Sequence, residues 1–542
     1  MKNIGIYLAY GPDQQLTGEG LGRLLGFLLS GLIQKKDYKI TIACPYWGKK
    51  EVIKLFEDMK IDEKNVSFLT TNGIPFWVRL YRYKNGHSQE EGRVFTIIKT
   101  FFDKGFLFVH KIIIEILTTR SVFFALSLML LVMMLLFVLS PLLLLSVVAF
   151  GLFVKLLPSL KRVMKAIFRI SKRFFRLNDD YFLYDEFRKR ELKKLADIIN
   201  KEEEIRVWLS PTVMWPEIRF VKKNVVTVVP DIVFFDFPAM FVHYYGGIKR
   251  IKRNMSNILE TLKSSSHFIT YSNYVKEYHL MQHLNIKECD ISVIPHGFIS
   301  NLDFFEEDNY KEKSNVYLKE YFNETRKKYF KLFKDNKGNK NIYRIQLKNY
   351  EYISSYGIDS CKYLFYPTQN RPNKNLSSLI KAMAIVVHKY KKDIKLILTA
   401  SIDSLMGLYD LIEEQNLQYH ILFFERVPSK VLAALNAKAI CSVNTTIFEG
   451  GFPFSFSEAY SVGTPSLLSK IPLVEEIVTE KSLAQFMLFD PYDPEDIAMK
   501  IVWAIDNAEQ LYEMENVIYQ KLASRTWKDV ADDYFRVLEN YS

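Results

Sequence analysis

The longest uninterrupted apolar stretch of the sequence is the feature that most limits what the chain can fold into. Residues 121–154 form a run of 34 residues without a charged side chain, rich in Leu, Val, Met and Phe. A buried core helix of this length would carry charges on one face, whereas one bilayer span needs about 20 apolar residues. The run is therefore too long for one membrane span and short for two.

A proline near the middle of this run predicts where it turns. Pro141 removes a backbone donor and disfavours the helical conformation of Ser140 before it. Two legs of about 17 residues would each reach about 25 Å as helices. We therefore expect residues 94–177 to form a transmembrane or re-entrant helical hairpin with flanking interfacial helices.

Basic residues on both sides of the run indicate its orientation. Arg120 precedes it, and eight Lys and Arg residues with no acid among them follow within residues 155–177. This pattern obeys the positive-inside rule and favours an anionic membrane as a partner. We expect the chain at the inner (cell) membrane, with its catalytic domains on the cytoplasmic side. Because the adjoining apolar run already explains the basic residues, nucleic acid is not an expected partner.

The rest of the composition is that of a globular protein of several domains. The chain has 542 residues, of which 49% are hydrophobic and 25% charged, and about 150 residues per domain suggests three or four units. Its four cysteines lie far apart without a Cys-x-x-Cys pair, which excludes a disulfide scaffold and argues against structural zinc.

Strand and helix patterns alternate on both sides of the apolar run, which predicts parallel sheets. The first unit is a strand at 2–10, a loop with Gly18 and Gly20, a helix at 21–34 and a strand at 39–44. The glycine loop is either a tight turn or an anion-binding loop. Further strands are expected at 205–209, 225–229, 268–272 and 291–294, and a second strand–helix series starts at 362. The predicted fold class is α/β, with two Rossmann-like domains facing a cleft.

The segment 445–465 (TTIFEGGFPFSFSEAYSVGTP) has the most specific chemistry. Gly450 and Gly451 open a turn whose free amides precede a helix, an arrangement that can hold a diphosphate. Glu449 and Glu458 flank this turn and can accept hydrogen bonds from sugar hydroxyls. Upstream, the segment 369–375 (QNRPNKN) follows a predicted strand and places cations where they can face the same phosphates.

These segments resemble the retaining, sugar-nucleotide-dependent glycosyltransferases of the GT-B fold (glycosyltransferase family 4, or glycosyl transferases group 1). The resemblance rests on TYSN at 270–273, ISVIPHG at 291–297, and the 369–375 and 449–465 motifs. It covers the C-terminal half and about half of the N-terminal part, and the two insertions lie outside it.

The resemblance implies catalytic roles for Glu449, at the donor sugar, and for Lys374 and Arg371, at the donor diphosphate. The implied donor-binding residues are Glu458 at the ribose, Gly450, Gly451 and Phe452 at the sugar, Gly463 and Thr464 at the phosphate pocket, and Gly18 and Gly20 at the cleft. We expect no metal and no cofactor besides the nucleotide-sugar substrate, because cations and oriented amides can stabilise the departing diphosphate and the chain has no Asp-x-Asp pair.

The residue patterns and the resemblance together give the expected domain boundaries. They are 1–93 and 178–300 for the two parts of the N-terminal Rossmann-like domain, 94–177 for the membrane hairpin, 301–360 for a polar insertion or linker, 361–525 for a C-terminal donor-binding domain and 526–542 for a C-terminal helix.

Some histidine and glutamate positions depart from the family pattern. Eight residues separate Glu449 from Glu458, where the family usually has seven, and Pro230 precedes Asp231 where the family often has histidine. Asp231 or His243 is the candidate replacement. His279 and His283 are four residues apart and are interpreted as a solvated helix face, and His296 as the support of a turn in the cleft.

The leading interpretation is a membrane-associated, retaining hexosyltransferase. It would move a sugar from a nucleotide-sugar to a lipid-linked or glycan acceptor in surface polysaccharide or glycolipid synthesis, with other glycan-assembly proteins as further candidate partners. One alternative, motivated by the two departures, is a catalytically inactive GT-B scaffold for glycan assembly at the membrane. Another is an enzyme whose hairpin only dimerises with a second membrane protein.

Overall fold

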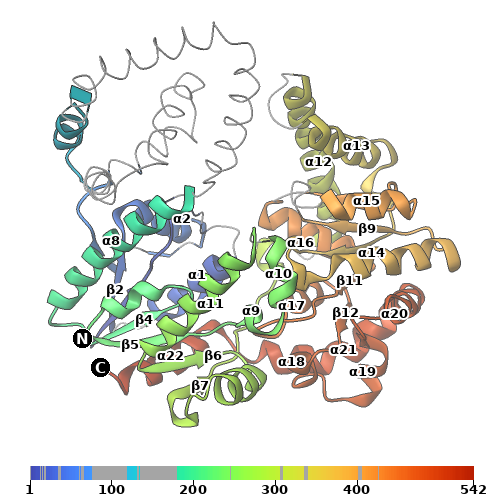
Figure 1. The fold of residues 1–542 in the computed structure, drawn as a ribbon. Coiled ribbons are helices and arrows are strands. Elements are labelled where there is room, and N and C mark those ends of the chain that lie inside the picture. The colour runs from blue at the N-terminus through green and yellow to red at the C-terminus, as the bar shows by residue number, and fades with distance from the viewer. Residues whose placement is uncertain are drawn as a thin grey trace, which may run out of the picture.

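The computed structural model describes most of the two predicted domains. The described residues are 2–12, 14, 16, 20–33, 38–59, 61–62, 66–75, 78, 119–130, 133–134, 180–244, 246–305, 309–334, 340–400, 406–424 and 427–542. Gly18 and residues 94–118, 131–132 and 135–177 of the predicted membrane hairpin lie outside these ranges. Figure 1 shows the two domains side by side.

The N-terminal domain is built on a parallel sheet that, within the described residues, has seven strands in the order β3-β2-β1-β4-β5-β6-β7. The strands are β1 (Lys2–Tyr7), β2 (Tyr38–Cys44), β3 (Val66–Thr70), β4 (Val207–Ser210), β5 (Asn224–Val228), β6 (His267–Thr270) and β7 (Ile291–Val293). The helices are α1 (Gly20–Ile33), α2 (Tyr46–Asp58), α8 (Asp180–Lys201), α9 (Val233–Asp236), α10 (Pro238–Tyr244), α11 (Ile248–Lys263) and the π-helix η3 (Val275–His283). Because β1 pairs with both β2 and β4, the predicted membrane segment interrupts a single domain.

The C-terminal domain has a second parallel sheet, with the order β10-β9-β8-β11-β12-β13 among the described strands. Its strands are β8 (Tyr363–Tyr366), β9 (Lys395–Leu398), β10 (Ile421–Phe423), β11 (Cys441–Asn444), β12 (Ser466–Ser469) and β13 (Leu488–Phe489). Its helices are α14 (Leu376–Ala384), α15 (Met406–Glu414), α16 (Ser429–Lys438), α17 (Phe454–Tyr460), α18 (Pro472–Glu475), α19 (Lys481–Met487), α20 (Pro494–Asp506) and α21 (Ala508–Ala523). The strand residues are almost all buried and mostly apolar, as expected where helices cover both faces of a parallel sheet.

Residues 301–360, interpreted from the sequence as a polar insertion, contain two long helices that pack on this second sheet. They are α12 (Tyr310–Lys334) and α13 (Lys340–Tyr356). Leu318 and Phe322 of α12 and Tyr350 of α13 are buried in one hydrophobic cluster with strand residues such as Phe365. The apolar residues recur at helical spacing instead of forming a continuous run, which is why the segment reads as polar along the sequence.

The C-terminal helix α22 (Trp527–Glu539) leaves the second domain and packs on the first. Val530 and Tyr534 belong to the same core cluster as Ile4 of β1. A capping box at Thr526 and Asp529 fixes the start of the helix, since each side chain accepts a hydrogen bond from the other's main-chain amide. The chain therefore crosses between the domains twice, once after β7 and once before α22.

The first of these crossings places His296 at the contact between the domains. The centroid of its ring lies 4.0 Å from that of Tyr271 and 4.7 Å from that of Phe454. Burial, together with the nearby positive charge of Arg525, lowers the pKa of His296 to about 3. The imidazole is therefore neutral at physiological pH and acts as a packing group between aromatic rings.

The described start of the predicted membrane hairpin is attached to the N-terminal domain. Arg120 forms an ion pair with Glu191 of α8, whose side chain is fully buried. Residues 122–130 are helical, and Phe123 and Leu126 are 83% and 54% exposed. In the part of the chain that the structure describes, no helix is both long enough and apolar enough to cross a membrane.

We expect acid to destabilise the native protein more than a His296→Asn variant. The folded-state pKa of His296 lies below the ordinary 6.5, so the unfolded chain binds the additional proton and stability is lost as the pH falls from about 6.5 towards 3. Thermal unfolding of both proteins at a series of pH values between about 7 and 4.5 tests this. The exposed His388, changed to Asn, is the control. Equal pH dependence of the native protein and the His296 variant would contradict the buried, neutral ring.

Candidate active site

The candidate site lies where the carboxyl ends of β8 and β11 meet. These strands are neighbours in the sheet, and the chain continues from β8 to one side, through β9 and β10, and from β11 to the other, through β12 and β13. Loops that leave such a switch point diverge and open a crevice, which is the usual ligand position in an open parallel sheet. The predicted segments 369–375 and 445–453 are the loops that follow these two strands.

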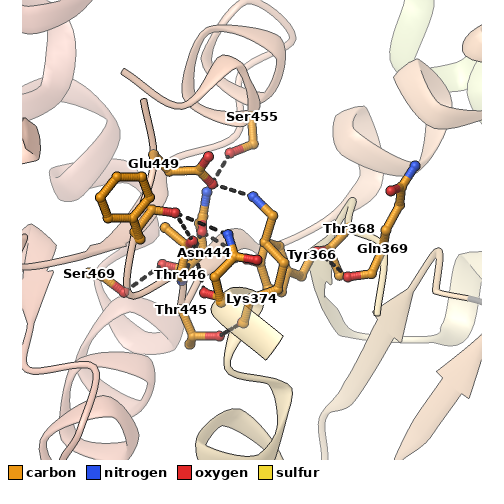
Figure 2. Close-up of polar contacts among 12 residues, drawn as sticks. Tyr366, Thr368, Gln369, Lys374, Asn444, Thr445, Thr446, Glu449, Ser455 and Ser469 are labelled. Atoms are coloured by element: carbon orange, nitrogen blue, oxygen red, sulfur yellow. Dashed lines mark hydrogen bonds and ion pairs between the residues drawn. The ribbon is translucent and has the colours of Figure 1, made fainter. Parts of the chain in front are cut away.

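An ion pair between Lys374 and Glu449 joins the two loops. The Lys374 ammonium contacts the Glu449 carboxylate, and each side chain is about one fifth exposed. Lys374 ends the short 3-10 helix η7 (Pro372–Lys374), and Asn375 then takes a left-handed conformation (φ 52°) that turns the chain into α14. Figure 2 shows the two side chains pointing toward one another from different elements.

Asn444, at the end of β11, organises the floor beneath this pair. Its Oδ1 accepts hydrogen bonds from the Tyr366 hydroxyl (2.9 Å) and the Thr446 amide (3.1 Å), and its Nδ2 donates to Ser455 Oγ (3.2 Å; Figure 2). Burial and, to a smaller extent, the nearby Glu449 raise the pKa of Tyr366, so its phenol stays protonated as a donor. The sequence reasoning missed Asn444. Its only signal was an amide side chain at the end of a predicted strand.

Two threonines hold the loops in register. Thr445 Oγ1 donates to the main-chain oxygen of Lys374 (3.1 Å), and Thr446 Oγ1 lies 3.1 Å from the main-chain oxygen of Asn373. The Ile447 amide donates to the same Asn373 oxygen (2.8 Å). Lys374 and Glu449 are therefore positioned by main-chain contacts between loops that are about 75 residues apart, the kind of support that a rigid site needs.

The glycine turn after Glu449 touches the N-terminal domain. A Cβ atom on Gly450 would lie 1.8 Å from the main-chain oxygen of Pro230, and one on Gly451 would lie 2.6 Å from Nε2 of His296. Ser272 Oγ donates to the main-chain oxygen of Gly450 (3.2 Å). Glycine is required at both positions because backbone and rings of the other domain occupy the space of a side chain. Phe452 follows the turn and packs edge-on against Phe456.

Asp231, from the loop after β5, faces the candidate residues of the other domain. Burial raises the pKa of its carboxyl and the nearby Glu449 raises it further, while the Val233 amide, Arg371 and Lys374 act in the opposite direction. Arg371 itself is exposed at the start of η7. The structure therefore brings Asp231 together with the three residues implied as catalytic. The side chain of His243 lies outside the described ones.

The remaining donor-binding residues implied by the resemblance lie in the helix and turn that follow. Glu458, in α17, is only 3% exposed, and its main-chain oxygen accepts a hydrogen bond from Asn301 Nδ2 (2.9 Å). Gly463 has φ +81°, and Thr464 Oγ1 donates to the main-chain oxygen of Asn436 (2.6 Å). Gly463 and Thr464 thus hold the α17–β12 connection against α16. Gly20 is the first residue of α1.

The interpretation of His279 as part of a solvated helix face was wrong. Its side chain is fully buried, and its Nε2 lies 2.7 Å from the Asp236 carboxylate. The reason is tertiary, because η3 packs against α9 and against Phe448 of the other domain, whose ring centroid lies 5.3 Å from that of the imidazole. The spacing of the histidines in the sequence does not predict the contact between His279 and Asp236.

A large cavity lies between the domains and reaches Glu449. Its volume is about 1400 Å³. Aromatic side chains from the N-terminal domain line one wall, including Phe237, Tyr274 and Tyr278. The opposite wall combines Lys470 and other residues of the loops that follow β12 and β13. The candidate carboxylate therefore faces a space that is large enough for an organic ligand.

Comparison with known proteins agrees with this architecture. Residues 351–521 match the family described as Glycosyl transferases group 1. Anabaena HepE, in complex with UDP and glucose, shares 12% identity with a TM-score of 0.54, and each chain is covered completely. The N-terminal domain of Candida albicans trehalose-6-phosphate phosphatase shares 11% identity with a TM-score of 0.53, covering 100% of this chain and 97% of that one. A comparison with curated proteins gave no match.

At this level of identity the solved structures establish the fold alone, which is the two-domain GT-B fold. The family match is independent of them and contains the loops of Lys374 and Glu449. The chain therefore has the GT-B fold, and residues 351–521 of its C-terminal domain are similar to the Glycosyl transferases group 1 family.

Proposed function

We propose that this protein is a glycosyltransferase that transfers a sugar from a nucleotide-sugar donor. The observation that carries the proposal is the Lys374–Glu449 pair beside the Gly450–Gly451 turn, inside the region that matches the family. HepE has been observed with UDP-glucose, which makes UDP-sugars the first donors to test.

In this proposal the charges of the site act on the leaving group. Lys374 and Arg371 bind the donor diphosphate, and the amides of Gly450 and Gly451 approach the sugar. Lys374 then exchanges its contact with Glu449 for the phosphate oxygens, which frees the carboxylate to accept hydrogen bonds from sugar hydroxyls. Cations and oriented amides stabilise the charge that develops on the nucleoside diphosphate, so we propose that no metal ion is needed. Glu458 is the proposed ribose contact, with a retaining outcome and a hexose as the transferred group.

We further propose that Asp231 replaces the histidine that the family often has at this point. Its carboxyl comes from the N-terminal domain and lies in the field of Glu449 and Lys374. Because burial raises its pKa, it keeps a proton at a higher pH than an exposed aspartate does. A protonated carboxyl can donate a hydrogen bond to a hydroxyl of the acceptor or the donor sugar.

We also propose where the protein lies and which class of acceptor it uses. Residues 121–154 form a hairpin in the inner membrane with both ends cytoplasmic, and the acceptor is lipid-linked, in surface polysaccharide or glycolipid synthesis. The exposed Phe123 and Leu126 in helix 122–130 support this, as does the attachment of Arg120 to the buried Glu191. Confinement to one surface raises the effective concentration of a lipid-linked acceptor, which a soluble acceptor would not share. Other glycan-assembly proteins are proposed partners there.

A second candidate function is a catalytically inactive GT-B scaffold. The burial of Glu458, together with the added residue between Glu449 and Glu458, favours it. Activity measurements separate the two functions, because a scaffold releases no nucleoside diphosphate from any donor.

We expect release of nucleoside diphosphate from one nucleotide-sugar in a donor screen with extracted membranes, and a loss of this activity in Lys374→Ala. The variant removes a charge-assisted contact of about 1.5–3 kcal/mol. Turnover should therefore fall by roughly 10- to 150-fold. Lys381→Ala, at an exposed lysine of α14, is the matched control.

The same screen tests the acceptor. Transfer to a polyprenyl-diphosphate glycan or a glycolipid should exceed transfer to the corresponding water-soluble sugar. No release from any donor, with or without membranes, would support the scaffold instead. Native-like turnover in Lys374→Ala would show that the candidate site is misplaced.

Gly450→Ala should lower the transfer rate while the domains stay folded. Its methyl group would overlap the main-chain oxygen of Pro230, so either the turn after Glu449 or the domain contact has to move. A displacement of about 1 Å at a reacting group can cost about 100-fold in rate. Gly407→Ala is the control, because Gly407 lies in α15 with open space around it. Equal turnover of both variants, at matched thermal stability, would contradict the role given to the turn.

Both ends of the proposed hairpin should lie on the cytoplasmic side. β1 to β3 precede the apolar run and β4 to β7 follow it, yet they form one sheet, so a single membrane crossing would divide a domain. Reporter tags inserted at Asn85-Gly86 and directly after Lys334 test this in whole cells. A tag after Ser542 is the control for the C-terminal domain. Tags that report opposite sides would rule out the hairpin.

A further inference from the structure

The C-terminal end of α12 is a strongly basic surface. Residues 326–334 (RKKYFKLFK) contain five cations and no acid. Lys327, Lys328, Lys331 and Lys334 are exposed. No ion pair is recorded for these four lysines among the side chains that the structure describes. We call residues 326–334 the basic tip.

The basic tip lies at the edge of the domain core. Leu318 and Phe322 in the first half of α12 pack against Tyr350 and Ile353 in the second half of α13, and all four are buried on the C-terminal sheet. Within the tip, Tyr329 stacks on Tyr350 with 5.5 Å between the ring centroids and so joins the edge of this cluster, while the lysines around it are exposed. Figure 1 shows the α12–α13 end at the upper edge of the molecule, the edge toward which helix 122–130 also extends.

An exposed aromatic side chain lies among the cations. The side chain of Phe330 is 55% exposed. On a helix, Lys327, Lys331 and Lys334 follow one another on one face, with Phe330 beside them. An apolar ring within a lysine face is typical of helices that lie at the boundary between lipid headgroups and acyl chains.

We propose that the basic tip binds the headgroups of an anionic bilayer, with Phe330 entering the interface. The inference rests on the proposed membrane association and goes beyond it, since it gives the C-terminal domain its own membrane contact. Lipid is favoured over nucleic acid because the exposed apolar helix 122–130 extends toward the same edge, and a bilayer would bind both an apolar and a basic surface. With one attachment point, the protein can still rotate relative to the bilayer. A second, in the other domain, determines how the cleft is presented to a lipid-linked acceptor.

The test uses the full chain with vesicles of phosphatidylcholine alone or mixed with phosphatidylglycerol. A fluorescent dye is attached through Lys328→Cys in a Cys289→Ser background, because Cys289 is the exposed native thiol. Quenching by nitroxide-labelled headgroups reports contact of the tip with lipid. We expect quenching with anionic vesicles, and a shift of at least about tenfold toward the undocked state when Lys327, Lys331 and Lys334 are changed to Gln. Added salt should have the same effect, and Phe330→Ala should weaken docking without changing its salt dependence.

The control changes Lys222, Lys263 and Lys287 to Gln. These exposed lysines precede β5, β6 and β7, at the end of the N-terminal sheet away from the cleft. The control should dock like the parent chain. Equal loss of docking in both triple variants would show that docking depends on the overall charge of the chain and not on the basic tip.

Cosedimentation with vesicles in high salt measures membrane binding by the hairpin separately. If the chain sediments with vesicles while its dye stays unquenched, the proposed lipid contact of the basic tip is wrong. If the chain never sediments with vesicles, the proposed membrane association is wrong as well. Tighter binding of the tip to a single-stranded oligonucleotide than to anionic vesicles overturns the assignment to lipid.

Discussion

Parallel pairing of the strands in both sheets is the constraint that determines where the polar groups of the site can lie. All carboxyl ends of one parallel sheet open at one edge, so loops far apart in the sequence meet there. Lys374 follows β8 and Glu449 follows β11, and the two strands are adjacent although 74 residues lie between the two side chains in the chain. The ion pair, the contacts of Asn444 and the two threonine hydroxyls are all consequences of that adjacency.

The contact between the domains depends on the absence of side chains at one turn. Gly450 and Gly451 allow Pro230 and His296 to approach the backbone that carries Glu449. The N-terminal domain therefore bears directly on the position of a candidate catalytic carboxylate, and Asp231 enters the same electrostatic environment. The second crossing, through α22, packs the C-terminus on the first domain and closes the connection between the two. A movement of one domain relative to the other would thus change the position of Glu449, because the contact is made by the main chain and not by long, flexible side chains.

The membrane proposals follow from the same topology. A sheet whose strands come from both sides of the apolar run has to be assembled on one side of a bilayer. In the proposed arrangement, the run therefore returns to the side from which it started. Arg120, paired with the buried Glu191, fixes where it leaves the N-terminal domain. The basic tip belongs to the other domain, so a lipid contact there would constrain the orientation of the cleft as well as its distance from the membrane.

The sequence by itself determined the alternation of strands and helices, the two-domain class and the loops of Lys374 and Glu449. Those features depend on local patterns, because buried parallel strands are apolar runs and a glycine turn before a helix is visible in the residues themselves. The short strands β3 and β13 were not predicted, because neither has a clear local pattern of its own.

Only the tertiary structure decided what depends on contacts between distant segments. It buried His279 against Asp236, packed α12 and α13 on the second sheet, placed Asp231 near Glu449 and made Asn444 the support of the site. No local pattern encodes these, because a polar or charged residue looks the same in the sequence whether its partner is water or a buried group from another element. The difference is set by desolvation and by the geometry of the partner, and both arise only when the chain is folded.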